Sequence, residues 1–165
     1  MSHENFNVLL VRDDRGQTRI ATSEEIIDTA RKMMSAKVRR GISMASPRLV
    51  KEFLSIKLGA LEYEIFCVLL LDKRLRLIEY VELFRGTIDG ASVHPREVVK
   101  LALAKNAASV VFAHPHPSGV AEPSQADELI TQRLKEALAL VDIRVVDHVI
   151  VAAGDVVSMA ERGAL

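Results

Sequence analysis

Two histidines separated by one residue, His114 and His116, stand directly after an apolar segment of the chain. Alternate residues of an extended backbone face the same way, so both imidazoles can reach one metal ion. Pro115 and Pro117 remove backbone donors and favour a stiff, extended exit from the preceding strand. Asp127, in the next helical segment, offers a carboxylate as a third ligand. Two histidines and one carboxylate leave a fourth zinc position for water, which is the pattern of catalytic zinc sites.

Zinc held in this way lowers the pKa of its water towards about 7 and polarises a substrate carbonyl, which is hydrolytic chemistry. The same residues also have a purely structural interpretation. A His-x-His pair alone is a weak signal for a metal, and Ser124 and Asp127 have the spacing of a capping box at a helix start. The two roles are compatible, because the first turn of a helix favours an ionised aspartate.

A hydrolytic zinc site also needs a proton acceptor, and the segment 75–84 offers Glu79 and Glu82. Alternation along a strand places the two carboxylates on opposite faces. Both faces are largely apolar, so either carboxylate is costly to bury without a partner. Periodicity does not choose between them, and both can instead lie at a solvated strand edge.

Other reactive residue types have structural interpretations. Cys67 lies inside an apolar run and is predicted to be a core residue rather than a nucleophile. His148 is predicted to be a structural histidine with a partner nearby rather than a fourth ligand. His94 is expected to belong to the local structure of a helix start. The segment 85–87 is expected to line the cleft, with its glycine in a tight turn.

The elements that position these residues follow from local patterns. Strands are predicted at 6–11, 17–21, 64–71, 75–84, 109–113, 143–152 and 155–158, and helices at 23–37, 47–58, 95–106 and 124–140. This mixed order indicates an α/β or α+β layered fold. We expect residues 1–41 to form an N-terminal extension, a strand pair plus a helix, and residues 42–165 to form the main domain.

Composition narrows the function classes. With 165 residues the chain is long enough for one domain with a sizeable core. Its 22 basic and 22 acidic residues cancel, and only 4% of residues are aromatic, so neither a broad electrostatic footprint nor a stacking platform for nucleic acid is indicated. The single cysteine excludes an intrachain disulfide and a cysteine-rich structural zinc site. No signal peptide or bilayer-spanning run is recognised, so we expect a cytoplasmic protein.

Several segments resemble one protein family. His114-x-His116, seven residues and then Ser124-x-x-Asp127 is the spacing of the JAMM/MPN+ metalloprotease signature. The segments ELFRGTIDGASVHPREVVKLALAKNAASVVFAHPHPSG, EPSQAD and VDIRVVDHVIV resemble the RadC family of JAB domains. The resemblance covers about residues 42–165 and implies the cytidine-deaminase-like α/β/α sandwich of JAB and MPN domains, with a mixed sheet. It implies that both histidines and Asp127 match zinc ligands.

The resemblance also implies that Glu82 matches the glutamate that hydrogen-bonds the zinc water, and that Ser124 matches the residue that steadies the tetrahedral oxyanion. The function implied is a zinc-dependent hydrolase of peptide or isopeptide bonds, with a protein or peptide as substrate. The alternative is a non-enzymatic module of DNA repair or of mobile elements with a structural metal.

Two departures from the family pattern stand out. Family members commonly read His-Asn-His, and Pro115 takes the middle position here. The helix-hairpin-helix segment of longer RadC proteins is expected to be absent, which with the neutral charge weakens the expectation of a nucleic-acid partner. No oligomeric state is predicted.

Overall fold

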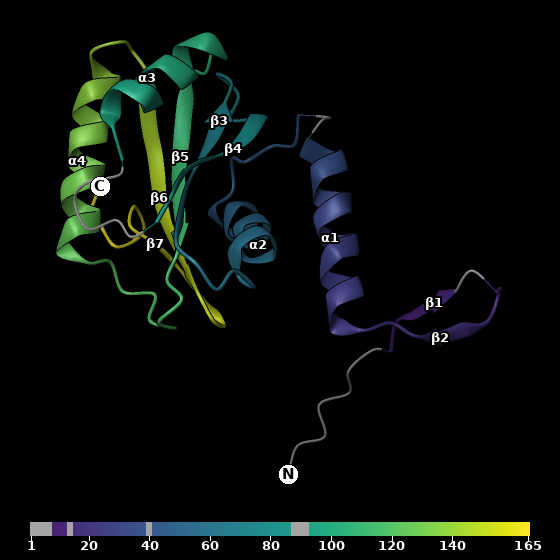
Figure 1. Ribbon diagram of the computed structural model, residues 1–165. Helices are drawn as coiled ribbons and strands as arrows, with labels where there is room; N and C mark the ends of the chain where they lie inside the picture. Colours follow the sequence, from purple (N-terminus) through teal and green to yellow (C-terminus); the bar gives the residue numbers. More distant parts are fainter. Residues whose placement is uncertain (1–7, 13–14, 39–40, 87–92) are drawn as a thin grey trace.

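The computed structural model describes residues 8–12, 15–38, 41–86 and 93–165 (Figure 1). The strands are β1 Leu10–Arg12, β2 Thr18–Ile20, β3 Ile65–Leu71, β4 Leu77–Arg85, β5 Ser109–Pro115, β6 Arg144–Ala152 and β7 Asp155–Ser158. The helices are α1 Ser23–Val38, α2 Pro47–Leu58, α3 Pro95–Ala104 and α4 Gln125–Ala139. Each of these elements was predicted, with ends that differ by a few residues. The parts of the predictions that fall on residues 6–7, 13–14 and 87–92 lie outside the described residues.

Five strands form one mixed sheet in the order β4-β3-β5-β6-β7. β5 and β6 run parallel, and the other neighbouring pairs run antiparallel. All seven residues of β3 are buried, as expected for a strand with neighbours on both sides and helices on both faces. The mixed sheet confirms the layered α/β fold.

The side chains of the sheet divide between two apolar layers. Alternate residues of β3, Cys67 among them, pack with α2 on one face. The residues between them, such as Phe66, pack with α3 and α4 on the other face. Figure 1 shows α2 on one side of the sheet and the α3–α4 pair on the opposite side. The domain is therefore the α/β/α sandwich that the family resemblance implied.

The end of β5 differs from the prediction in a way that matters for chemistry. The predicted strand ends at residue 113, whereas the observed strand continues to Pro115. Parallel pairing explains the extension, because His114 pairs with Ile150 and Pro115 pairs with Val151 on β6. His114 is consequently held in a central strand rather than in a loop, and its direction is set by the sheet.

The two N-terminal strands form a small sheet of their own. β1 and β2 make a two-stranded antiparallel sheet that leads into α1. The predicted capping box is present, because Thr22 N donates to Glu25 Oε2 at 2.9 Å and Glu25 N donates to Thr22 Oγ1 at 3.2 Å. Met34, near the end of α1, packs against the core layer of α2. The hairpin lies away from the sandwich (Figure 1).

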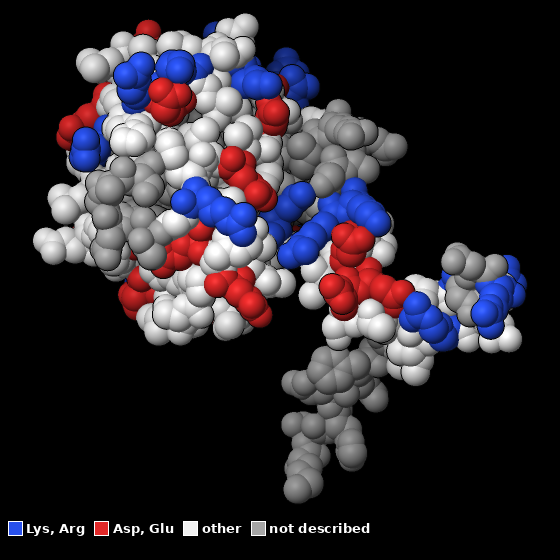
Figure 2. Space-filling model, viewed as in Figure 1, with Lys and Arg blue, Asp and Glu red and all other residues white. Residues whose placement is uncertain are grey.

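The charges that cancel in the composition also mix on the surface. Figure 2 shows Lys and Arg side chains next to Asp and Glu side chains over much of the visible face. Ion pairs between them include Arg19 with Glu25 at 2.6 Å and Lys105 with Glu79 at 2.7 Å. None of the helices within the described ranges has both the length and the apolar character needed to cross a membrane.

A buried aspartate, Asp147, ties the C-terminal turn to β6. Its carboxylate accepts hydrogen bonds from His148 N at 2.7 Å, Ala160 N at 3.0 Å and Ser158 Oγ at 2.6 Å, and burial raises its pKa. Asp147→Ala leaves these donors without their acceptor, so we expect the free energy of unfolding in urea to fall by about 1–3 kcal/mol. Asp155→Ala, at an exposed position of β7, is expected to change it by less than about 0.5 kcal/mol. Equal losses in the two variants would contradict the assigned role.

Candidate metal centre

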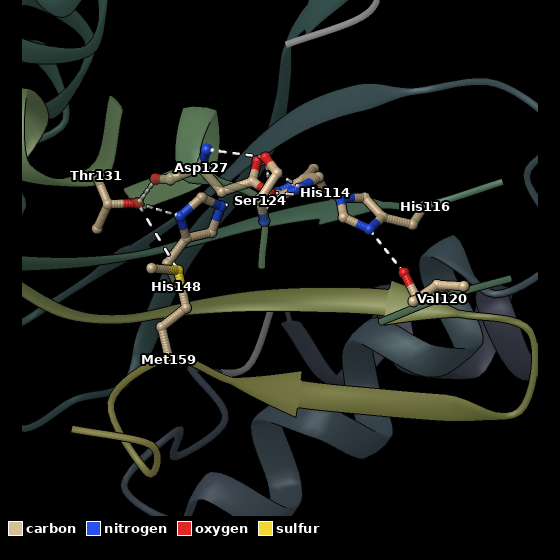
Figure 3. Close-up of polar contacts among 8 residues, drawn as sticks. All are labelled: His114, His116, Val120, Ser124, Asp127, Thr131, His148 and Met159. Atoms are coloured by element: carbon tan, nitrogen blue, oxygen red, sulfur yellow. Dashed lines mark hydrogen bonds and ion pairs between the residues drawn. The ribbon is translucent and has the colours of Figure 1, made fainter. Parts of the chain in front are cut away.

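His114 and His116 lie at the end of β5, on the side of the sheet that α4 covers. The His114 side chain is wholly buried, and that of His116 is 15% exposed. Their Nε2 atoms are 2.8 Å apart. His114, His116 and Asp127 each offer one ligand atom, and these three atoms lie within 4.8 Å of one another (Figure 3). The structure therefore brings together the three residues predicted to hold a metal.

Backbone contacts fix where His116 points. Its backbone N donates to Val151 O at 2.7 Å, so the contact with β6 continues past the end of β5. Its ring Nδ1 lies 2.8 Å from the carbonyl oxygen of Val120 in the loop before α4 (Figure 3). A carbonyl oxygen only accepts, so Nδ1 is the donor, and in a neutral ring Nε2 then carries the lone pair. That lone pair faces His114 and Asp127.

Asp127 is oriented by the N-terminal cap of α4. Ser124 donates to Asp127 Oδ2 from its backbone N at 2.7 Å and from Oγ at 2.6 Å, and Asp127 N donates back to Ser124 Oγ at 3.2 Å. The capping box predicted for these two residues is present. It occupies Oδ2 and leaves Oδ1 directed at His114 Nε2, 3.1 Å away. One helix cap thus aims the carboxylate at the histidines.

The charge of the centre follows from burial and contacts. Burial by itself raises the pKa of Asp127, but the contact with the His114 ring, together with the Ser124 donors, holds that pKa well below its usual range. The carboxyl is therefore ionised at neutral pH. An ionised carboxylate beside two imidazole nitrogens is a donor set that zinc accepts.

His148 lies behind His114 and is a partner rather than a ligand. Its Nε2 is 2.9 Å from His114 Nδ1, and its Nδ1 contacts the hydroxyl of Thr131 on α4. Burial lowers the pKa of His148 well below its usual value, so its ring is neutral. The prediction of a structural histidine with a partner nearby is confirmed. Sequence reasoning missed Thr131, although its place four residues after Asp127 puts both on one helix face.

Glu82 lies away from this group. Its side chain is exposed and accepts a hydrogen bond from the Tyr80 hydroxyl at 3.4 Å. Tyr80 in turn contacts Cys67 and packs in the layer covered by α2, which is the opposite face of the sheet from His114. Because alternate strand residues share a face, Glu82 points to the Tyr80 side. The structure does not bring Glu82 to the His–Asp group.

Another carboxylate, Glu64, stands at the same edge of the sheet as the group and was not singled out from the sequence. It precedes β3, which runs antiparallel to β5, so it stands at the edge of the sheet where β5 ends. It is two residues before Phe66, whose ring contacts His148 on the α4 face. Alternation therefore places half-buried Glu64 on the same face as His114. The pairing of β3 with β5, which the sequence does not reveal, was the missing information.

Glu64 also belongs to a surface cavity beside the histidines. The lining residues are Glu62, Tyr63, Glu64, Arg85, Gly86 and Pro117, and the last of these directly follows His116. The Arg85 guanidinium lies 3.9 Å over the ring of Tyr63. Two of the residues expected to line a cleft, Arg85 and Gly86, do so, and the third, at position 87, lies outside the described residues.

Two further predictions concern residues away from the centre. Cys67 is buried and contacts the Tyr80 hydroxyl at 3.1 Å, and burial raises the pKa of its thiol to about 12, so it is a core residue as predicted. His94 precedes α3 at its N-terminal cap, and its ring lies edge-on against Phe84. It stands at the helix start as expected, but its side chain makes no capping hydrogen bond there.

Comparison with known proteins places the chain in a family. Residues 44–164 match the model of the RadC-like JAB domain. The chain is 55% identical to a UPF0758 protein of Marinobacter nauticus over 148 residues, and this matched stretch covers 90% of the chain and 66% of the relative. It is 58% identical over 139 residues to a UPF0758 protein of Nitrosococcus oceani, which covers 84% of this chain and 62% of the relative. The chain thus spans just under two thirds of the length of these relatives. It belongs to the family of RadC-like JAB domains.

Proposed function

We propose that the protein is a JAMM-type hydrolase that cleaves a peptide or isopeptide bond and that His114, His116 and Asp127 hold its zinc ion. The observation that carries this proposal is the convergence of three ligand atoms within 4.8 Å at the end of a central strand. The other polar atoms of the three side chains are engaged by Val120, Ser124 and His148, which leaves these ligand atoms for a metal. Membership in a JAB family supports the same chemistry.

Zinc, when bound, supplies a Lewis acid that polarises a substrate carbonyl and acidifies a water molecule. The protein supplies the proton transfers. We assign these to Glu64, because its carboxylate lies at the cavity and on the face of His114. Glu64 takes a proton from the attacking water as the new C–O bond forms, and it returns that proton to the amine nitrogen as the C–N bond breaks.

Ser124 is proposed to stabilise the oxyanion formed from the substrate carbonyl. Its hydroxyl donates to Asp127 in the structure, and its backbone N makes a second bond to the same oxygen. The backbone bond keeps the carboxylate oriented if the hydroxyl turns toward a developing negative charge. A donor placed in this way favours the transition state over the substrate.

Metal removal and reloading tests the proposal. After treatment with a chelator and dialysis against zinc, the protein is expected to hold about one zinc ion per chain by elemental analysis, because there is one set of ligands. The reloaded protein is expected to generate new amino termini in a peptide library or to release amines from isopeptide-linked peptides, as read by mass spectrometry. The chelated protein is expected to do neither.

The outcomes separate the possible failures. A protein that takes up no zinc would contradict the metal site itself. Zinc uptake without cleavage of either substrate class would contradict the hydrolase and keep the metal site. If that second result came with salt-sensitive binding to DNA, the alternative of a DNA-associated module with a structural metal would be favoured.

A further inference from the structure

We infer that Thr131 and His148 are positioning residues that hold His114 in the tautomer whose lone pair is on Nε2, the atom that faces the metal site. This inference rests on the metal site of the proposed function and adds two residues that contact neither metal nor substrate. The chain of contacts runs from α4, through a ring buried against β5, to the ligand itself (Figure 3). Each step along it favours one placement of the proton.

The first step is the hydroxyl of Thr131. Its Oγ1 lies 2.5 Å from the backbone carbonyl oxygen of Asp127 and 2.5 Å from Nδ1 of His148. A carbonyl oxygen has no proton to give, so the single hydroxyl proton of Thr131 points to it rather than to Met159 Sδ, which lies farther away at 3.9 Å. The hydroxyl then only accepts from His148. Nδ1 of His148 therefore carries a hydrogen.

The second step is the ring of His148. The ring is wholly buried and lies edge-on against Phe66 and Phe112, at centroid distances of 5.6 and 5.9 Å. Such surroundings disfavour a charged imidazolium. A neutral imidazole has one N–H, and Thr131 takes it, so Nε2 of His148 carries a lone pair. This lone pair accepts from His114 Nδ1 at 2.9 Å.

The third step reaches the ligand. With one N–H directed to His148, a neutral His114 ring has its lone pair on Nε2. The carbonyl of Val120 imposes the same tautomer on His116 independently. Two lone pairs then face each other at 2.8 Å, beside Asp127 Oδ1 at 3.1 Å from His114. Acceptors held together without a shared proton repel one another, and a divalent cation between them removes the repulsion.

Thr131 also connects two ligands mechanically. Its hydroxyl bonds to the carbonyl of Asp127 and to the ring behind His114, so one side chain links the backbone of α4 to β5. Partners behind metal-binding histidines fix ring orientation and raise ligand basicity, and their loss costs about 10–100-fold in metal affinity. We expect that range for the loss of this chain.

Four variants test the inference through zinc affinity, measured by competition with a chromogenic chelator. His148→Leu removes the acceptor at similar size, and Thr131→Val removes the hydroxyl at the same shape. Both are expected to weaken zinc binding by about 10–100-fold. His148→Gln retains an acceptor for His114, and Thr131→Ser retains the hydroxyl, so both are expected to bind zinc nearly as the unmodified protein does.

A spectroscopic readout in the metal-free protein keeps the test independent of zinc. Nitrogen NMR of the histidine rings is expected to show a hydrogen on Nδ1 of His114, and a mixture of tautomers in Thr131→Val. The inference would be overturned if Thr131→Val kept both the His114 tautomer and the zinc affinity of the unmodified protein. It would also be overturned if Thr131→Ser and Thr131→Val lost zinc affinity equally. Failure of the unmodified protein to bind zinc would contradict the proposed function instead, and the NMR result would still decide the tautomer.

Discussion

Asp127→Asn is expected to weaken zinc binding by more than about 100-fold. The loss of a residue that only supports a metal ligand costs less, about 10–100-fold in metal affinity. The substitution preserves the shape of the side chain but removes the negative charge that Oδ1 presents to the histidines. The amide oxygen still accepts hydrogen bonds from Ser124, so the cap of α4 is retained. Titration against a chromogenic chelator measures the loss directly.

Thermal unfolding gives a second measure of the same effect. A ligand present at 100 times its Kd stabilises the folded state by about 2.7 kcal/mol, which corresponds to a rise in Tm of about 5–10 °C for a chain of this size. Asp127→Asn is expected to lose this rise at the same zinc concentration. Glu128→Gln, an exposed position in the same turn of α4, is the matched control and is expected to retain it. Equal zinc responses in the two variants would contradict the role of Asp127 as a ligand.

Glu64→Gln is expected to retain about one zinc ion per chain and to reduce amide hydrolysis by about 10²–10⁴-fold, the range that general acid–base catalysis supplies. Glutamine has nearly the shape of glutamate but cannot take up the proton of an attacking water. The measurement is the rate of amine release at saturating and limiting substrate, together with the zinc content of each preparation.

Glu82→Gln is the competing variant, because the family resemblance assigns the proton acceptor to that position. Glu82 shares a face with Tyr80 and Cys67, so we expect its substitution to change the rate far less than that of Glu64. Glu79→Gln, which breaks a surface pair with Lys105, controls for the loss of any one charge on β4. A rate that falls in Glu82→Gln and not in Glu64→Gln would overturn the assignment of the base.

The order and type of the helices and strands were predictable because each depends on local pattern. The apolar run of β3 predicts a strand covered on both faces, and all seven of its residues are buried. Thr22 with Glu25 and Ser124 with Asp127 predict helix starts through capping boxes, and both are present. The end of β5 was placed too early, because the residues that extend it are held by β6, which follows much later in the chain.

The three residues that could hold a metal were predictable and the position of Glu64 was not, for a related reason. His114, His116 and Asp127 lie within a short stretch of sequence, and strand alternation and helix capping already bring them together. The partners that complete the centre come from strands far away in the chain. The antiparallel pairing of β3 with β5 brings Glu64 to the site, and the parallel pairing of β5 with β6 brings His148 behind His114.

The amino-acid sequence alone therefore determined the family, the layered α/β class and the three side chains that meet at one point, since these depend on local spacing. Only the tertiary structure decided which face each carboxylate occupies and which groups contact each ring nitrogen of the histidines. Those properties depend on strand register and on buried contacts between distant segments, because shifting a strand by one residue exchanges its two faces.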